Sequence, residues 1–148
     1  MILPLDPTEP GRAQRIVAIQ RAAYAVEAEL MGFHAIPPLH ETEEQVATLG
    51  HLCWRGAFDG PRLVGIVAWE LQGDALEIDR LAVDPAFGRQ GRGRQLVQAV
   101  PEVPTITVST GHANRPALSL YSSLGFREIG RTEIAEGVFT TQLERRSR

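Results

Sequence analysis

Glycine and arginine crowd the stretch Gly88–Arg94, and residues of these types at this spacing are suited to holding phosphate. The apolar run before it stops at Asp84 and Pro85, and helical spacing resumes at Leu96. Glycines let the chain turn sharply and leave successive amide N–H groups unpaired at the start of a helix, where the macrodipole also favours an anion. The stretch is therefore predicted to be a phosphate-binding loop.

The spacing of this loop excludes two common nucleotide motifs. It lacks a Gly-Lys-Ser/Thr ending, and a dinucleotide fingerprint would need glycine where Leu96 stands. Gly88–Gly93 resembles the acyl-CoA pyrophosphate loop of the GNAT superfamily of N-acyltransferases, whose pattern is Arg or Gln, two residues, Gly, one residue, then Gly or Ala. The chain departs from it at the leading position, which is Gly88, with Arg89 beside it. A tight turn and a nucleic-acid patch are the alternatives, and both rank below a phosphate-bearing cofactor.

A second motif lies in the segment Asn114–Phe126. Asn114 is a good helix N-cap, and Gly125 occupies the position of a left-handed C-terminal cap. The GNAT pattern likewise has an asparagine at the start of this helix, a tyrosine seven positions later, here Tyr121, and a Gly-Phe ending. Both motifs occur in the family's order with a strand between them, so the resemblance extends from about Leu63 to the C-terminus.

The resemblance implies a fold, a reaction and an acyl donor. The expected fold is the α/β (α+β) GNAT fold, with a mixed, mostly antiparallel sheet of six to seven strands flanked by about four helices. The expected enzyme is an acyltransferase, an N-acetyltransferase that moves an acetyl group from acetyl-CoA to a primary amine by direct attack in a ternary complex and releases coenzyme A. The alternative is a non-catalytic acyl-CoA-binding sensor or subunit of the same fold.

Residues of the two motifs and of the strand before the loop are expected to bind acetyl-CoA. By the resemblance, the strand pairs with the pantetheine arm, the loop surrounds the pyrophosphate and the later helix contacts the arm. The expected cofactor-binding residues are Leu81, Ala82, Val83, Arg89, Gln90, Gly91, Arg92, Gly93, Arg94, Asn114 and Tyr121. The Val83 amide is the expected donor to the oxyanion of the tetrahedral intermediate.

Proton transfer needs two further groups. A free alkyl amine is protonated near neutrality, so a carboxylate has to accept its proton, and the departing thiolate needs a donor. By the resemblance, Glu77 is the catalytic base, with Asp79 in reserve, and Tyr121 donates to the thiolate. Strand alternation puts Glu77 and Asp79 on the face of Leu81 and Val83 unless a bulge intervenes. An ion pair of Glu77 with an arginine, a locally satisfied Tyr121 hydroxyl, and water as the base are the alternatives.

The acceptor site is expected between the first two helices and their connection. The proposed acceptor-binding residues are Tyr24, Glu27, Phe33 and His34, beside further glutamates of the same helices. An acidic rim next to aromatic side chains favours a cationic amine as partner, such as a small metabolite, an antibiotic or a peptide N-terminus. The alternative is that these glutamates form an ordinary solvated helix face.

Periodicity predicts the elements that position these residues. A long helix is expected to begin with Asp6-Pro7-Thr8-Glu9 and to end near Gly32, and Thr42 with Gln45 forms a capping pair that opens a second helix. In the long helix, the positions predicted to be buried are Ile16, Ile19, Ala23, Val26 and Leu30. Strands are expected at 2–5, 52–58, 63–71, 75–83 and 105–109, followed by a closing hairpin around 136–137. The strands 75–83 and 105–109 should be parallel neighbours, because a helix separates them.

Length and composition bound the remaining possibilities. The 148 residues are expected to form one N-acetyltransferase domain over 1–148. A net charge of −3 favours neither nucleic acid nor an anionic membrane as partner. Cys53 is the lone cysteine, and the four histidines lack metal-ligand spacing, so no metal is expected. The absence of a signal peptide pattern favours a cytoplasmic protein, and an exposed sheet edge leaves a homodimer open.

Overall fold

Seven strands form one mixed sheet in the computed structural model, which describes residues 1–147. The strands are β1 Ile2–Pro4, β2 Cys53–Asp59, β3 Arg62–Gln72, β4 Ala75–Val83, β5 Thr105–Gly111, β6 Arg127–Ala135 and β7 Val138–Arg146. Their spatial order is β1-β2-β3-β4-β5-β7-β6, and all neighbours are antiparallel except β4 and β5, which are parallel. The predicted mixed, mostly antiparallel sheet with its single helical crossover is confirmed.

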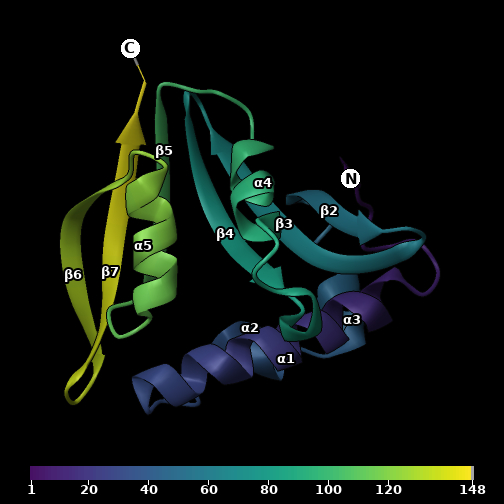
Figure 1. Cartoon of the computed structure of the whole chain (residues 1–148), viewed down its shortest axis with the longest axis horizontal. Helices are drawn as coiled ribbons and strands as arrows, with labels where there is room; N and C mark the ends of the chain where they lie inside the picture. The colour runs from purple at the N-terminus through teal and green to yellow at the C-terminus, as the bar shows by residue number, and fades with distance from the viewer. Residues whose placement is uncertain (148) are drawn as a thin grey trace.

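Helices cover both faces of this sheet (Figure 1). They are α1 Arg12–Met31, α2 Pro37–His40, α3 Glu43–Ala47, α4 Arg92–Gln98 and α5 Arg115–Ser123, with a short 3-10 turn at Pro85–Phe87. One apolar core lies between the sheet and α4 and α5, and a second lies between the sheet and α1 and α3. The short α2 falls in the connection between the two helices that the sequence predicts, and prolines in its first turn suit a helix start. Within residues 1–147, no helix has the length and apolarity that crossing a membrane requires.

Local capping chemistry sets most helix ends as the sequence predicts. Thr42 and Gln45 form a reciprocal capping box, with N–O distances of 3.2 and 2.9 Å. The long helix α1 begins later than predicted, because Asp6 binds Thr8 in a turn and the chain enters the helix at Gly11. The predicted apolar face is buried only in the first half of α1. Further along, Val26 is 51% exposed, because it borders an open cavity beside β4.

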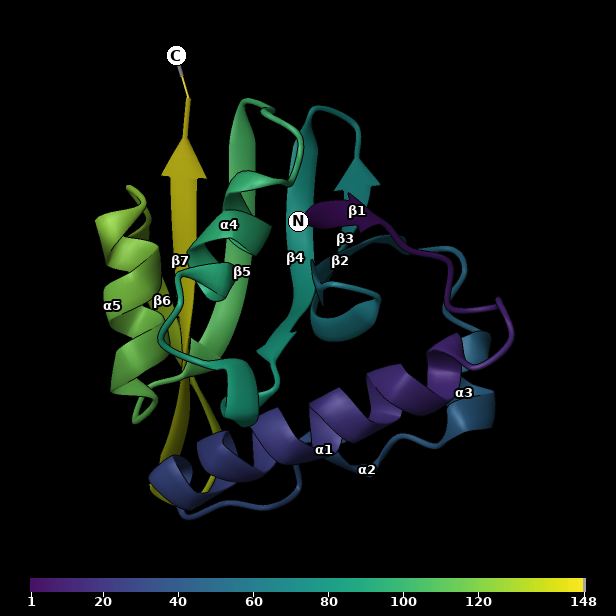
Figure 2. The same cartoon turned by 45° about the vertical axis from the view of Figure 1, so that its right-hand side comes forward.

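The sheet opens between β4 and β5. Their ladder ends at the pair Ile78 and Val108, although β4 continues to Val83 and β5 to Gly111. Figure 1 shows the two strands together at one end and apart where they approach α1, and Figure 2 shows α1 running across the same end. The crossover strands therefore leave unpaired edges that face each other across a gap, and α1 closes one end of this gap.

A β-bulge reverses the faces of β4 in the middle of the strand. Ile78 and Arg80 pair with adjacent residues of β3, so Asp79 is the extra residue. Ile78 and Leu81 both face the core under α4 and α5, although they are three residues apart. Glu77, the neighbour of Ile78, consequently lies on the opposite face from Leu81. Glu77 was predicted to share a face with Leu81 and Val83 unless a bulge intervenes. The bulge does intervene, so Glu77 does not share that face.

Candidate active site

Two cavities open where β4 and β5 separate. The first, of about 550 Å³, lies between α1, the end of β4, the glycine-rich loop and α5. The second, of about 240 Å³, lies between α1, the segment after it, β4, β5 and α5. Both are lined by Tyr24, Glu27, Leu81, Asn114 and Ala117, so the two cavities meet at these residues. A molecule in one cavity can therefore touch a molecule in the other.

The glycine-rich loop presents free amides beside the first cavity. The amides of Phe87 and Gly88 bond back to the preceding turn, and that of Gln95 bonds to Gly91. Those of residues 89–94 donate to no group among the described residues. Positive φ angles of 62° at Arg89 and 76° at Gly91 turn the backbone in the first half of this run. The loop thus offers the set of donors that a phosphate group requires.

Only one of the three loop arginines lines this cavity. Arg89 does so, together with Gly88 and Gly93. The Arg92 guanidinium instead turns back into the fold, where it donates to the Phe87 carbonyl at 3.3 Å and also contacts Gln90 and Asp59. Arg94 donates to the Ser123 hydroxyl at 2.7 Å. The side chains of Arg92 and Arg94 are therefore occupied by contacts within the protein, which the sequence could not reveal.

The free edge of β4 carries main-chain groups into the gap. The amide after the strand, at Asp84, donates to Val64 of β3 at 2.8 Å, so by strand alternation Ala82 also directs its main chain toward β3. Leu81 and Val83 therefore direct theirs away from β3. The Leu81 carbonyl already accepts a bond from the Tyr24 hydroxyl at 3.3 Å. Of the three strand residues predicted to bind the cofactor, Leu81 and Val83 offer main-chain groups to it.

Tyr121 lies in the wall of the second cavity. It is 3% exposed and packs edge-on against Phe126 at a centroid distance of 5.3 Å. Burial, with smaller contributions from Tyr24 and Glu27, raises the pKa of Tyr121 well above its ordinary value, so the phenol stays protonated. Its hydroxyl has no hydrogen-bond partner among residues 1–147, so the proton remains available to a bound molecule.

Asn114 is positioned by its role as a helix cap. Its Oδ1 accepts a bond from the Ala117 amide at 3.3 Å, as predicted for the start of α5. The left-handed Gly125 and the bond from the Phe126 amide to the Tyr121 carbonyl end the same helix. Asn114 also borders both cavities. Capping and cavity lining are thus compatible at this residue.

The predicted base Glu77 is not in either cavity. It lines a separate hollow of about 300 Å³ on the face of the sheet opposite α4 and α5, with Thr107 and Gln142 among its neighbours. Asp79 borders both this hollow and the second cavity. Its carboxylate accepts a bond from the Arg80 Nε at 2.7 Å. The bulge therefore separates Glu77 from Tyr121 and leaves Asp79 in an ion pair.

Three of the four predicted acceptor residues line the second cavity. Tyr24, Glu27 and Phe33 do so, whereas the exposed His34 ring points elsewhere and lies 3.7 Å from Glu29. The cavity also has residues that the sequence did not single out, among them Met31, Ile36, Val108, Thr110, Ile134 and Thr140. In the sequence, only the large side chains after Gly32 indicated this wall. Residues of β5 and of the β6–β7 hairpin are distant in sequence and join the wall only when the chain folds.

Comparison with known proteins identifies the class of this protein. The family model "Acetyltransferase (GNAT) domain" matches residues 50–128, which is more than half of the chain. The chain therefore belongs to the GNAT acetyltransferase family. This confirms the resemblance that the two sequence motifs carry.

Particular relatives and structures are similar to the chain over most of its length. It is 34% identical over 142 residues to UPF0157 protein YqkA of Bacillus subtilis (strain 168), a match covering 93% of this chain and 41% of that protein. The chain spans about two fifths of the length of the curated relatives it matches.

Solved structures share the fold at low sequence identity. PaiA N-acetyltransferase from Thermoplasma acidophilum, in complex with coenzyme A, has a TM-score of 0.80 at 14% identity, covering 99% of this chain and 98% of that one. The ribosomal-protein-S18-alanine N-acetyltransferase from Escherichia coli has a TM-score of 0.77 at 21% identity, covering 99% and 92%. These likenesses confirm the GNAT fold.

Proposed function

We propose that this chain is an N-acetyltransferase that moves an acetyl group from acetyl-CoA to a primary amine by direct attack in a ternary complex. The observation that carries the proposal is the meeting of two cavities at Leu81 and Asn114, within reach of the protonated Tyr121. A donor in the first cavity and an acceptor in the second would touch there. Membership of the GNAT family and the coenzyme A complex of a protein with this fold support the same reading.

The first cavity fits an acyl-CoA. The unpaired amides of residues 89–94 would hold the pyrophosphate, and Arg89 would add a positive charge beside it. The outward main-chain groups of Leu81 and Val83 would pair with the amides of the pantetheine arm, as a further strand would. When bound, acetyl-CoA supplies the thioester that is attacked.

Two groups of the chain would serve the transition state. The Val83 amide is directed into the gap and would donate to the oxyanion that forms on the thioester carbonyl. The Tyr121 hydroxyl, kept protonated by burial, would donate to the departing sulfur. With Cys53 exposed on β2, far along the sheet from the β4–β5 gap, the chain offers no thiol nucleophile at the site, which favours direct attack.

The second cavity fits an amine on an apolar stem. Its walls are largely apolar, and among the described residues that line it the one cation, Arg80, is already paired with Glu41 and Asp79. An acceptor with its own carboxylate or phosphate would therefore find no free positive charge. Glu27 gives the cavity negative charge, which favours a cationic acceptor. We expect alkyl and arylalkyl amines to be preferred over free amino acids.

A thiol-release assay with acetyl-CoA and a panel of amines tests the proposal. Wild-type protein is expected to release coenzyme A with apolar amines, and Tyr121→Phe is expected to lower kcat by about 100-fold with unchanged acetyl-CoA affinity by calorimetry. Wild-type protein that binds acetyl-CoA but turns over with no amine would instead leave a non-catalytic acyl-CoA-binding module. A preference for acidic acceptors would contradict the acceptor class.

A further inference from the structure

We propose that Glu27 of α1, and neither Glu77 nor Asp79 of β4, binds the acceptor ammonium and removes its proton. This inference rests on the proposed function. Glu27 lines both the first cavity, called here the donor cavity, and the second, called the acceptor cavity. It is the one carboxylate among the described residues at the junction of the two cavities. The base has to reach the nitrogen where that nitrogen meets the thioester, and the junction is that place.

The two carboxylates of β4 are less suited by their positions. The bulge turns Glu77 into a hollow on the face opposite α4 and α5, and Glu77 lines neither of the cavities that meet at Leu81. Asp79 does line the acceptor cavity, but it is bonded to Arg80 at 2.7 Å. That bond occupies one oxygen of the Asp79 carboxylate, so Arg80 competes there with an incoming ammonium. Glu77 is therefore too far from the junction to act as the base, and Asp79 is less suited to that role because it is paired with Arg80.

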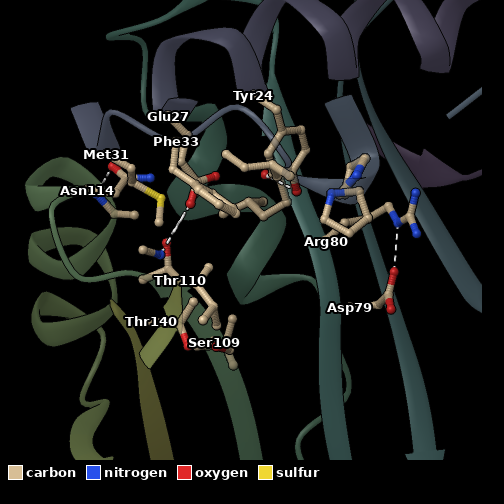
Figure 3. A pocket seen from close by; sticks show the side chains of 18 of the residues that line it. Tyr24, Glu27, Met31, Phe33, Asp79, Arg80, Ser109, Thr110, Asn114 and Thr140 are labelled. Atoms are coloured by element: carbon tan, nitrogen blue, oxygen red, sulfur yellow. Dashed lines mark hydrogen bonds and ion pairs between the residues drawn. The ribbon is translucent and has the colours of Figure 1, made fainter. Parts of the chain in front are cut away.

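Glu27 is held in place by β5. Its Oε1 accepts a bond from the Gly111 amide at 3.2 Å and lies 3.4 Å from the Thr110 hydroxyl, which leaves Oε2 without a protein partner among residues 1–147. Figure 3 shows Glu27 and Tyr24 projecting from α1 toward the cavity, with Glu27 joined to Thr110. A fixed carboxylate with one free oxygen can accept an ammonium proton without first reorganising.

Five other charged or titratable groups line the two cavities near Glu27. Tyr24 lies on α1, Asp79 and Arg80 on β4, Arg89 on the loop and Tyr121 on α5. Arg80 is neutralised by its carboxylate partners, and both tyrosines stay protonated because burial raises their pKa. Among the described residues that line the acceptor cavity, Glu27 is therefore the one carboxylate without an ion-pair partner.

The proton balance of the transfer then closes. The acceptor ammonium gives one proton to Glu27, and its free electron pair forms the C–N bond to the thioester carbonyl carbon. The C–S bond breaks, and its electron pair leaves with the sulfur. The second nitrogen proton passes to the sulfur by way of the Tyr121 hydroxyl, which gives its own proton and takes this one. Glu27 returns the first proton to solvent, so one proton is released for each amide formed.

The decisive experiment compares pH profiles of kcat/KM for the amine. Glu27→Gln keeps an oxygen that can accept from the Gly111 amide, so it removes the base but spares the contact with β5. The matched control is Glu29→Gln, an exposed residue on the same helix that lines neither cavity. Glu77→Gln and Asp79→Asn test the rivals. Calorimetry with acetyl-CoA and thermal unfolding are measured on every variant.

We expect Glu27→Gln to lower kcat/KM near neutrality by about 100-fold, with acetyl-CoA affinity and thermal midpoint unchanged. Its remaining activity should rise about tenfold per pH unit toward the pKa of the amine, because only the free amine reacts, whereas the wild type should be flat there. Two results would overturn this inference and leave the proposed function standing. Either Glu27→Gln shows the wild-type rate and pH profile, or the fall in kcat/KM appears in Glu77→Gln or Asp79→Asn instead. A wild type that binds acetyl-CoA and acetylates no amine overturns the proposed function and this inference with it.

Discussion

Arg80 of β4 and Glu41, which precedes α3, form an ion pair beside the acceptor cavity, with N–O distances of 2.5 and 3.3 Å. Gln20 of α1 joins the pair, since its side chain bonds to both residues and also donates to the Pro38 carbonyl at 3.2 Å. The network ties the sheet to the segment that forms one wall of the second cavity. The pair thus positions the acceptor wall, in addition to neutralising Arg80.

Glu41→Gln is expected to loosen this wall. The Arg80 side chain is 6% exposed, and losing one charge leaves it undercompensated in a buried place, at a cost of about 2–4 kcal/mol in the free energy of unfolding. KM for the amine should rise, while KM for acetyl-CoA stays unchanged, because the donor cavity lies on the other side of Leu81. Urea unfolding and steady-state kinetics measure both. Glu43→Gln, an exposed change on α3, is the control, and equal stability of the two variants would contradict the role of the pair.

Sequence reasoning located the features that depend on near neighbours. The capping box of Thr42 and Gln45 and the glycine cap after α5 need only residues within one turn, so their spacing shows them. The roles expected for the strand before the loop, namely pairing with the pantetheine arm and donation by the Val83 amide, came from the family resemblance. The bulge at Asp79 depends on how β4 pairs with β3, and nothing within β4 alone indicates it.

Partners distant in the chain account for the other differences. The Arg92 side chain turns to Asp59, which lies in a different hairpin, and the sequence gives no sign of this contact. Arg80 and Glu41 are separated by 39 positions, so neither could be recognised as half of a pair. Glu27 was assigned to the acceptor site, but its place at the junction depends on β5 meeting α1. Contacts of this kind are set by packing, which local patterns do not encode.

Gly91→Asp is expected to abolish acetyl-CoA binding without unfolding the protein. A Cβ at this position would meet no atom within 4 Å, so crowding is not the cause of the loss. The φ angle of 76° adds strain of about 1–2 kcal/mol, and the new carboxylate would repel a phosphate held by the neighbouring amides. Calorimetry with acetyl-CoA is the measurement.

Gly137→Asp provides a matched control for that change. Gly137 has a φ of 72° and equally open surroundings, but it lies in the β6–β7 turn, away from the loop. Both variants should lose similar stability, and only Gly91→Asp should lose affinity. Equal affinity in the two variants would show that the loop does not hold the phosphates.

Gly111→Ala is expected to disturb the acceptor cavity through Met31. An added Cβ would overlap the Met31 Sδ, so the Met31 side chain has to move, and this side chain lines the cavity. KM for the amine should rise several-fold while the fold persists. Met31→Ala removes the clash, so the double variant should recover amine binding relative to Gly111→Ala. Kinetics of the two single variants and the double variant test this coupling, and additive losses would argue against it.

Asp84→Asn is expected to destabilise the protein at neutral pH and to matter less in acid. The Asp84 carboxylate accepts bonds from the Ala86 amide at 3.0 Å and from Arg15 of α1 at 2.8 Å. Burial opposes its ionisation, but these donors outweigh burial and hold the pKa of Asp84 below its ordinary value. A depressed pKa stabilises the folded state above the unfolded pKa of about 3.9, and this stabilisation is lost as pH falls through the folded pKa.

Urea unfolding at two pH values measures this effect. Near neutrality the variant should lose about 1.5–3 kcal/mol, since a charged hydrogen bond to Arg15 is replaced by a neutral one. As pH falls from about 3.9 through the lower pKa of folded Asp84, the wild type gives up this stabilisation, so the difference between the two proteins should shrink toward zero. Asp74→Asn, in an exposed turn, should change stability little at either pH. A difference that stays constant with pH would mean that packing, and not the charge of Asp84, anchors α1 to the end of β4.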